Sequence, residues 1–147
     1  MLPERKKLPH GLPSWVPDGS RHFITINCCS RGTNVLAHEN IAVPLIESIA
    51  VYEELQKWYM YVMVIMRDHV HMIATCTRSG IRAVIAPWKG FQAKTLGIDW
   101  QEDFFEHRLR NDAEFTEKLY YVLMNPVRQG LVENWRDWPY TFVRGEW

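Results

Sequence analysis

The sequence predicts an α+β fold: an antiparallel sheet of the ferredoxin-like split βαβ type, with an added C-terminal helix that carries a tyrosine. Two observations predict it. Segments with strand character and segments with helical spacing follow one another as strand, helix, strand, strand, helix, strand, helix. The first six elements in this order match the split βαβ arrangement, in which both helices cover one face of the sheet. The other face is then expected to be free for binding.

The first strand and the first helix are marked by their apolar periods. Apolar and polar residues alternate over 22–28, with Ile24, Ile26 and Cys28 on one face and Phe23, Thr25 and Asn27 on the other. Positions 41, 45, 49, 52 and 55 then follow helical spacing over 39–57. Pro44 is near the start of this helix, where a missing N–H does least harm.

A hairpin is expected next. The segment 58–66, WYMYVMVIM, is apolar on both faces, as in a central strand that is covered on both sides. Arg67–Asp68 interrupts it, and alternation resumes over 69–77. One face of this strand would carry Val70, Met72, Ala74 and Cys76, and the other face would carry His69, His71, Ile73 and Thr75.

The second half of the chain predicts a helix, a strand and a last helix. Ser79 is a candidate N-cap for a helix with apolar residues at 81, 84, 85 and 88, which Pro87 should kink or split. Residues 103–110 are interpreted as a strand. Asn111 and Glu114 resemble a capping box that opens the last helix. This helix should end near Met124, because Pro126 disfavours helical geometry at the preceding residue.

Length and composition indicate a single domain over 1–147, with an irregular, basic, proline-rich lead-in at 1–20. The formal net charge of zero excludes a uniformly basic nucleic-acid binder. Between residues 67 and 96, however, there are five basic residues and only one acidic residue. These charges form either a local basic surface or ordinary solvated helix faces. Three cysteines without disulfide or zinc spacing favour the cytoplasm. The longest apolar run is far shorter than the roughly 20 residues of a membrane span.

Two histidines on one strand face raise the question of a metal site. His69 and His71 are two residues apart, so their side chains point the same way. They are either ordinary surface histidines or part of a divalent-metal site. A third ligand with an oxygen donor would make such a site suitable for Mg²⁺ or Mn²⁺.

The last helix supplies candidates for the rest of such a site. With about 100° per residue, Phe115, Leu119 and Val122 form its buried stripe. Tyr121 and Asn125 are four residues apart on one flank of the stripe, and Tyr120 is on the opposite flank. Asn125 offers a carbonyl oxygen, and a tyrosine beside a phosphate-polarising metal is a plausible nucleophile.

These segments together resemble the REP-associated tyrosine transposases, a branch of the single-tyrosine HUH transposases. HVH (69–71) is similar to the family's histidine–hydrophobe–histidine motif, and YVLMNPVRQGLVENWRDWPYTF (121–142) is similar to its closing pattern. WQEDFFEHRLR (100–110) and HFITINC (22–28) resemble the segment before the last helix and the first strand. The resemblance covers about Arg21 to Arg144, so 21–144 is expected to be the catalytic core.

The resemblance implies a metal-dependent enzyme that cleaves and transfers single-stranded DNA, often folded as hairpins. Tyr121 would attack the scissile phosphate and leave a 5′-phosphotyrosine link, and His69, His71 and Asn125 would bind Mg²⁺ or Mn²⁺. The expected protein is cytoplasmic and nucleoid-associated and has no membrane partner. A monomer is favoured, and a homodimer is the alternative. The alternatives are a catalytically inactive protein of the same fold that binds DNA hairpins and a metal-dependent phosphodiesterase without a covalent step.

The chain differs from the family pattern at two places, and it carries basic residues that are candidates for DNA contacts. The family often has Pro-Asn where this chain has Arg67–Asp68, so Asp68 could support a ligand, approach the metal or simply form the turn. The neighbouring Tyr120 competes with Tyr121 for the role of nucleophile. The candidates for sequence-independent phosphate contacts are Arg67, Arg78, Arg82, Lys89, Lys94, Arg108, Arg110 and Arg128.

Overall fold

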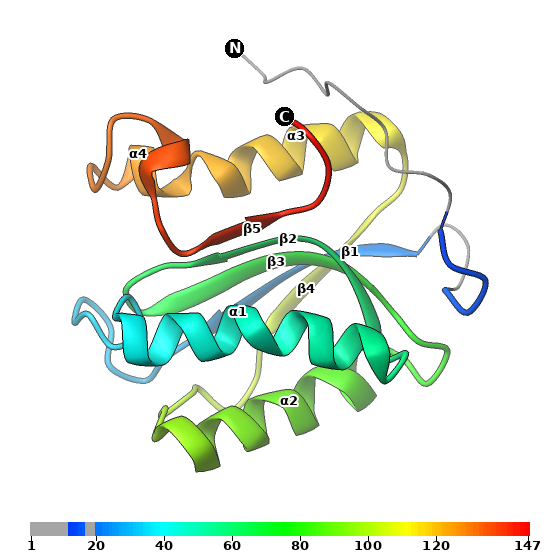
Figure 1. Cartoon of the computed structure of the whole chain (residues 1–147), viewed down its shortest axis with the longest axis horizontal. Coiled ribbons are helices and arrows are strands. Elements are labelled where there is room, and N and C mark those ends of the chain that lie inside the picture. The colour runs from blue at the N-terminus through cyan, green and yellow to red at the C-terminus, as the bar shows by residue number, and fades with distance from the viewer. Residues whose placement is uncertain (1–11, 17–19) are drawn as a thin grey trace.

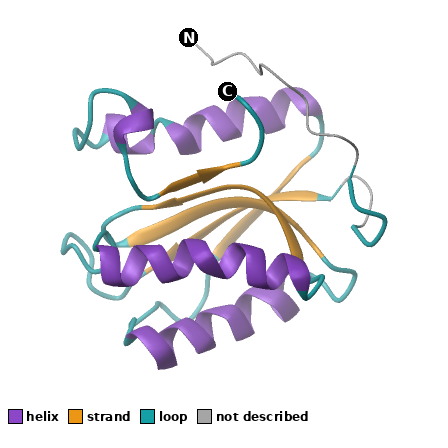
Figure 2. Cartoon of the chain, in the orientation of Figure 1, coloured by secondary structure: helices purple, strands orange, loops and turns teal. Residues whose placement is uncertain are grey.

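The chain folds into one five-stranded antiparallel sheet with helices on both faces (Figures 1 and 2). The structure is a computed structural model that describes residues 12–16 and 20–147. Its elements are β1 (Arg21–Asn27), α1 (Glu39–Glu54), β2 (Trp58–Ile65), β3 (His69–Cys76), α2 (Ile81–Leu96), β4 (Phe105–Leu109), α3 (Asp112–Leu123), α4 (Asn125–Arg128), a 3₁₀ helix (Trp135–Asp137) and β5 (Thr141–Val143).

The strand order is β4-β1-β3-β2-β5, and every neighbouring pair is antiparallel. The first four strands have the order expected of the split βαβ arrangement. The predicted α+β class is therefore confirmed. The fifth strand was not predicted from the sequence: only three of its residues pair with β2, which is too short a run for a period of two to be recognised.

Helices α1 and α2 lie together on one face of the sheet (Figure 1). The core on this side contains the alternate strand residues that the sequence predicts, including Ile24, Ile26, Val70 and Met72. Trp88 of α2 is fully buried against the sheet, with its ring centroid 5.8 Å from that of Trp58. This layer buries the two tryptophans and supplies much of the hydrophobic stabilisation.

Helix α3 lies on the opposite face, so the expectation of a free sheet face is wrong (Figure 1). Phe115, Leu119 and Val122 of α3 are buried against the sheet, as their spacing predicts. A helix with an apolar stripe must bury that stripe against another element, and this sheet face is where α3 does so. The binding surface is therefore left at the flank of α3 rather than across the whole face.

The start of α2 and its proline differ from the sequence-based expectations. The N-cap is Gly80, with a φ of 99°, rather than Ser79, and no side chain caps the helix. Helix α2 is continuous over Ile81–Leu96, with Pro87 inside it. Pro87 and Ala83 are both on the exposed side, so the carbonyl that Pro87 leaves without a helical N–H can be solvated instead.

The predicted start of α3 is confirmed. The side chain of Asn111 accepts a hydrogen bond from the backbone N–H of Glu114, at 2.8 Å. The Glu114 carboxylate in turn accepts from the N–H of Arg110, one residue earlier than in a standard capping box. These two bonds set the point at which the chain leaves β4 and enters the helix that carries Tyr121.

Part of the expected lead-in lies outside the described residues. Residues 12–16 form a turn, in which the N–H of Val16 donates to the carbonyl of Pro13, and Val16 is buried on the α3 face. The remainder, 1–11 and 17–19, is not described. None of the helices in the described part of the chain has the length and apolar character needed to cross a membrane.

Candidate active site

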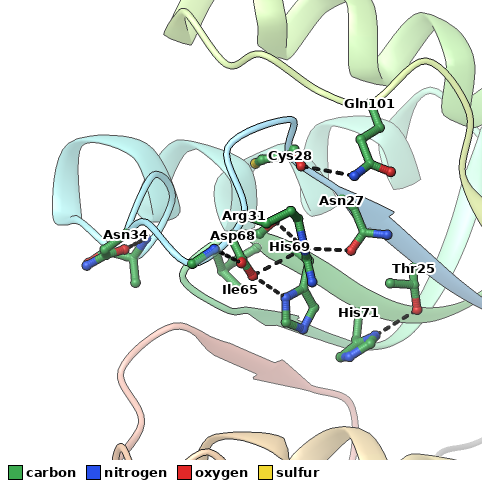
Figure 3. Close-up of polar contacts among 12 residues, drawn as sticks. Thr25, Asn27, Cys28, Arg31, Asn34, Ile65, Asp68, His69, His71 and Gln101 are labelled. Atoms are coloured by element: carbon green, nitrogen blue, oxygen red, sulfur yellow. Dashed lines mark hydrogen bonds and ion pairs between the residues drawn. The ribbon is translucent and has the colours of Figure 1, made fainter.

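His69 and His71 lie side by side on the sheet face that α3 covers (Figure 3). The register between β1 and β3 places Asn27 opposite His69 and Thr25 opposite His71. The two imidazole rings have centroids 4.6 Å apart and planes inclined at 74°. The alternation of the strand thus brings both side chains to one place, as the spacing predicts.

Each imidazole is held at its Nδ1 atom by a different side chain (Figure 3). The Nδ1 of His69 is 2.7 Å from Oδ1 of Asp68, and the Nδ1 of His71 is 2.8 Å from Oγ1 of Thr25. Histidines that bind metal usually have one ring nitrogen engaged by such an outer partner. Nε2 is then the atom available to a ligand on both rings.

The electrostatic setting keeps both imidazoles neutral near pH 7. Burial lowers the pKa of His71 to about 3, and the nearby positive charges of Arg128 and Lys118 act in the same direction. Burial also lowers the pKa of His69, although the Asp68 carboxylate opposes this shift. A neutral imidazole with a free lone pair is the form that coordinates metal ions.

Tyr121 lies beside His71, within one chain. The ring centroids of Tyr121 and His71 are 6.1 Å apart, and Phe23 contacts both rings. The Tyr121 side chain is 44% exposed, so a large substrate can reach it. Within the described residues, the His71 ring contacts the ring of Tyr121 and not that of Tyr120, as the helical geometry indicates.

Asn125 follows Tyr121 by one helical turn and is only 4% exposed. Met124, between α3 and α4, keeps a right-handed helical backbone, and its N–H donates to the carbonyl of Tyr120. Pro126 is in the first turn of α4, where it is tolerated, and so it does not disrupt the four-residue step. Tyr121 and Asn125 therefore remain neighbours on the flank of the helix.

Two cations flank the Tyr121 ring. The guanidinium carbon of Arg128 is 4.1 Å from the ring centroid, and its Nη2 donates to the Tyr121 carbonyl. The Lys118 ammonium is 4.8 Å from the same ring and 4.7 Å from that of Phe23. These contacts restrict the tyrosine ring through cation–π attraction and place two positive charges close to it, where a phosphate could bind.

Two grooves open at the candidate site. The larger, of about 380 Å³, lies between β4 and α3 and is lined by His107, Leu109, Glu114, Glu117, Lys118 and Tyr121. The smaller, of about 190 Å³, is lined by residues that include Arg67, Asp68, His69 and Gln129. One groove therefore leads to the tyrosine and the other to the first histidine.

The two histidines of the candidate site have the chemistry expected of divalent-metal ligands. In the part of the chain that the structure describes, no three His, Cys, Asp or Glu side chains gather as a metal site. The candidate ligands are instead two neutral imidazoles and one amide oxygen, from His69, His71 and Asn125. The engaged Nδ1 atoms of the two histidines are the observation that supports this fit.

The candidate phosphate contacts are mostly far from this site. The expectation is wrong for Lys89, which is buried and donates to the backbone carbonyls of Gln101, Glu102 and Asp103. Arg82 pairs with Asp103 on the α2 side. Three further residues lie away from the site. Arg78 follows the far end of β3, and Lys94 is on α2. Arg108 lies between His107 and Leu109 on β4 and therefore points to the face opposite the groove.

Three of the predicted basic residues lie nearer to the site. Arg128 contacts Tyr121, and Arg67 lines the smaller groove with His69. Arg110 lies between β4 and α3, ahead of the helix that carries the tyrosine.

The sequence interpretation missed Phe23, Thr25, Arg31 and Lys118. Lys118 precedes Tyr121 by three residues on α3, so helical spacing contained a usable signal for it. Thr25 becomes visible only through the strand register, which pairs it with His71. The position of Arg31 depends on the loop after β1, for which the sequence offers no periodic signal.

Known proteins resemble this chain in sequence. The chain is 26% identical over 132 residues to a REP-associated tyrosine transposase of Escherichia coli (strain K12), over 86% of this chain and 78% of that protein. A local match of 42 residues is 45% identical to a protein of Haemophilus influenzae named "Putative REP-associated tyrosine transposase", covering 29% of this chain and 24% of the relative. No family model matches.

A solved structure of a REP-associated tyrosine transposase bound to a REP hairpin shares the fold. Its TM-score is 0.73 at 23% sequence identity, and the alignment covers 90% of this chain and 82% of that one. The resemblance of this chain to the REP-associated tyrosine transposases, which the sequence motifs predict, is thereby confirmed.

Proposed function

We propose that this chain is a metal-dependent endonuclease and strand transferase for single-stranded DNA, of the REP-associated tyrosine transposase kind. The observation that carries the proposal is the position of Tyr121 beside His71, with ring centroids 6.1 Å apart. An accessible phenol next to a pair of neutral imidazoles is suited to covalent attack on a phosphodiester. The name of the Escherichia coli relative supports the same reaction class.

The proposed substrate is DNA that folds into a hairpin of the REP type. A solved relative of the same fold is bound to a REP hairpin. In this chain, Lys118 and Arg128 place two positive charges against the Tyr121 ring, which suits a DNA backbone entering along α3.

In the proposed reaction, the Tyr121 oxygen forms a bond to the scissile phosphorus while the bond to the 3′-oxygen breaks. The phenol loses its proton, and the departing 3′-oxygen gains one. The product is a 5′-phosphotyrosine link and a free 3′-OH. The phosphotyrosine link is itself a phosphodiester and replaces the one that was cleaved. A later 3′-OH can therefore attack this link, release Tyr121 and join the strands without ATP.

The side chains of the site divide the remaining tasks. His69, His71 and Asn125 would hold Mg²⁺ or Mn²⁺. When bound there, the ion would polarise the phosphate and orient it for in-line attack. Arg128 and Phe23 restrict the tyrosine ring, so that less conformational freedom is lost when the phosphate arrives.

A monomer with the tyrosine acting in cis is the proposed working form. The closeness of Tyr121 and His71 within one chain supports it, since no second copy is needed to complete this pair. Such an enzyme would work on DNA in the cytoplasm, at the nucleoid, in keeping with its three free cysteines.

The covalent link gives the direct test. Wild-type protein, Tyr121→Phe and the matched control Tyr120→Phe are incubated with Mn²⁺ and a panel of end-labelled DNA hairpins, and the products are separated by denaturing electrophoresis. We expect a protein–DNA adduct with wild type and Tyr120→Phe, and none with Tyr121→Phe. An adduct of equal yield with Tyr121→Phe contradicts the proposal.

The same experiment separates the alternatives. Hairpin binding that is unchanged by EDTA and by His69→Ala, without any adduct, indicates a protein that binds and does not turn over. Cleavage that survives Tyr121→Phe and disappears in His71→Ala indicates a metal-dependent phosphodiesterase without a covalent step.

A further inference from the structure

Asp68 precedes the first histidine of the site, at a position where the sequence alone left several roles open. Its Oδ1 atom is 2.7 Å from Nδ1 of His69. Its Oδ2 atom accepts a hydrogen bond of 2.7 Å from the backbone N–H of Gly32. Both oxygens are thus engaged within the protein, which argues against direct coordination of a metal by Asp68.

The contact with Asp68 determines which nitrogen of His69 carries the proton. An ionised carboxylate only accepts hydrogen bonds, so the Nδ1 of His69 must donate. The lone pair of the neutral ring is then on Nε2. The side chains of Asp68 and His69 are 15% and 13% exposed, so water competes little for this hydrogen bond.

The Asp68 carboxylate is held in place by a neighbouring cation and by two hydrogen-bond donors. The Arg31 guanidinium lies 3.3 Å from Oδ1 of Asp68 and also donates to the Asp68 carbonyl and to the side chain of Asn27 (Figure 3). Gly32 reaches Asp68 with a φ of 80°, a backbone conformation that favours glycine.

His71 has no comparable restraint. Its Nδ1 atom pairs with the hydroxyl of Thr25, which can donate or accept and therefore does not select a tautomer. The two candidate ligands thus differ: His69 is paired with a charged group and His71 with a neutral one. A carboxylate partner raises the basicity of a ligating imidazole and adds negative charge near the cation.

We propose that Asp68 is the positioning residue of the candidate metal site: it holds His69 as the Nδ1–H tautomer, directs Nε2 at the metal and tightens divalent-metal binding. This inference rests on the proposed function, because it assumes that His69 is a metal ligand. It assigns to Asp68 an indirect role, through His69, and no contact with the substrate.

The tautomer is measured first, in metal-free protein. Histidine ¹⁵N chemical shifts are recorded for wild type, Asp68→Ala and the control Asp103→Asn, which alters a carboxylate that pairs with Arg82 away from the site. We expect His69 to be the Nδ1–H tautomer in wild type and in the control. In Asp68→Ala we expect a shift towards the Nε2–H tautomer. Unchanged His69 shifts in a folded Asp68→Ala protein overturn the inference.

Metal affinity is measured second, by electron paramagnetic resonance of free Mn²⁺ during titration. Removing an outer partner of a ligand typically weakens metal binding about 10–100-fold, and we expect that loss for Asp68→Ala. Asp68→Asn, which keeps a carbonyl oxygen as acceptor and removes the charge, should be intermediate. It also guards against misfolding, because the two side chains have the same shape.

The outcomes separate this inference from the proposed function. If wild type binds Mn²⁺ and loses binding in His69→Ala, but Asp68→Ala and Asp68→Asn bind as wild type does, the role of Asp68 is overturned and the metal site stands. If wild type binds no Mn²⁺, the proposed metal site fails and the positioning role fails with it.

Discussion

The two faces of the sheet are built from alternate residues of the same strands, yet they have different contents. Towards α1 and α2, β1 and β3 present Ile24, Ile26, Val70 and Met72, all fully buried. Towards α3, the same strands present Thr25 and His71 among aromatic side chains. One face is an ordinary hydrophobic core, and the other combines a smaller core with the polar groups of the candidate site.

This difference shows how the fold accommodates buried polar groups. A polar side chain in a core must find a hydrogen-bonding partner. On the α3 face, Thr25 partners His71, and the Tyr61 hydroxyl lies 3.2 Å from the hydroxyl of Thr75. On the α1/α2 face, the indole N–H of Trp88 donates a hydrogen bond to the hydroxyl of Ser48, and most other contacts are apolar. Changes on the two faces should therefore affect different properties.

The largest expected effect is on stability, from the α1/α2 face. Trp88→Ala removes a fully buried indole and should lower the free energy of unfolding by about 3–5 kcal/mol. Urea denaturation measures this, and adduct formation at a temperature where the variant is still folded should persist. A Trp88→Ala protein of wild-type stability, or a folded one without adduct formation, would break the proposed division between the faces.

The next effect is the response of the α3 face to acid. Burial lowers the pKa of His71 to about 3, so between that value and the ordinary value of about 6.5 the unfolded chain binds a proton that the folded protein excludes. The stabilisation is fully present above pH 6.5 and decreases below it, with a slope that approaches about 1.4 kcal/mol per pH unit.

Urea denaturation of metal-free protein from pH 7 to 4.5, with His71→Gln as the comparison, isolates this contribution. The slope should be smaller in His71→Gln. On the other face, burial raises the pKa of Cys28 and Cys76 to about 12, so these thiols do not titrate in this range. Equal slopes in wild type and His71→Gln would contradict the assignment of acid sensitivity to the α3 face.

A smaller effect should distinguish two arginines. Arg128→Ala removes the cation over the Tyr121 ring and the hydrogen bond to the Tyr121 carbonyl, and should slow hairpin cleavage about tenfold. Arg82→Ala, on the α2 side, removes an exposed pair with Asp103 and should leave cleavage unchanged. Initial rates on one labelled hairpin measure both variants, and an equal loss in both would point to a general charge effect.

The smallest effect concerns the start of α3. Asn111→Ala removes its side-chain cap and should cost about 1 kcal/mol of stability, whereas Asn111→Gly should cost a few tenths. Helices α1 and α2 have no side-chain cap, so Ser79→Ala is the matched control and should be neutral. Thermal unfolding of the three variants provides the comparison.

The sequence predicted the elements because their periods are local. Alternation in β1 and β3 and the stripe of Phe115, Leu119 and Val122 on α3 depend only on neighbouring residues, and the structure confirms them. Helical spacing also indicated that Tyr121, rather than Tyr120, shares a face with Asn125. Where the local signal was short or ambiguous, as at β5 and at the start of α2, it was missed or misplaced.

The sequence by itself therefore determined the fold class, the shared face of His69 and His71, and the resemblance that links them to a tyrosine some fifty residues later. Only the tertiary structure decided which helix covers that face, that Lys89 is buried and donates to backbone carbonyls, and that Asp68 and Thr25 engage the two imidazoles in different ways. These relations depend on strand register and on packing between distant segments, and no local period in the chain encodes them.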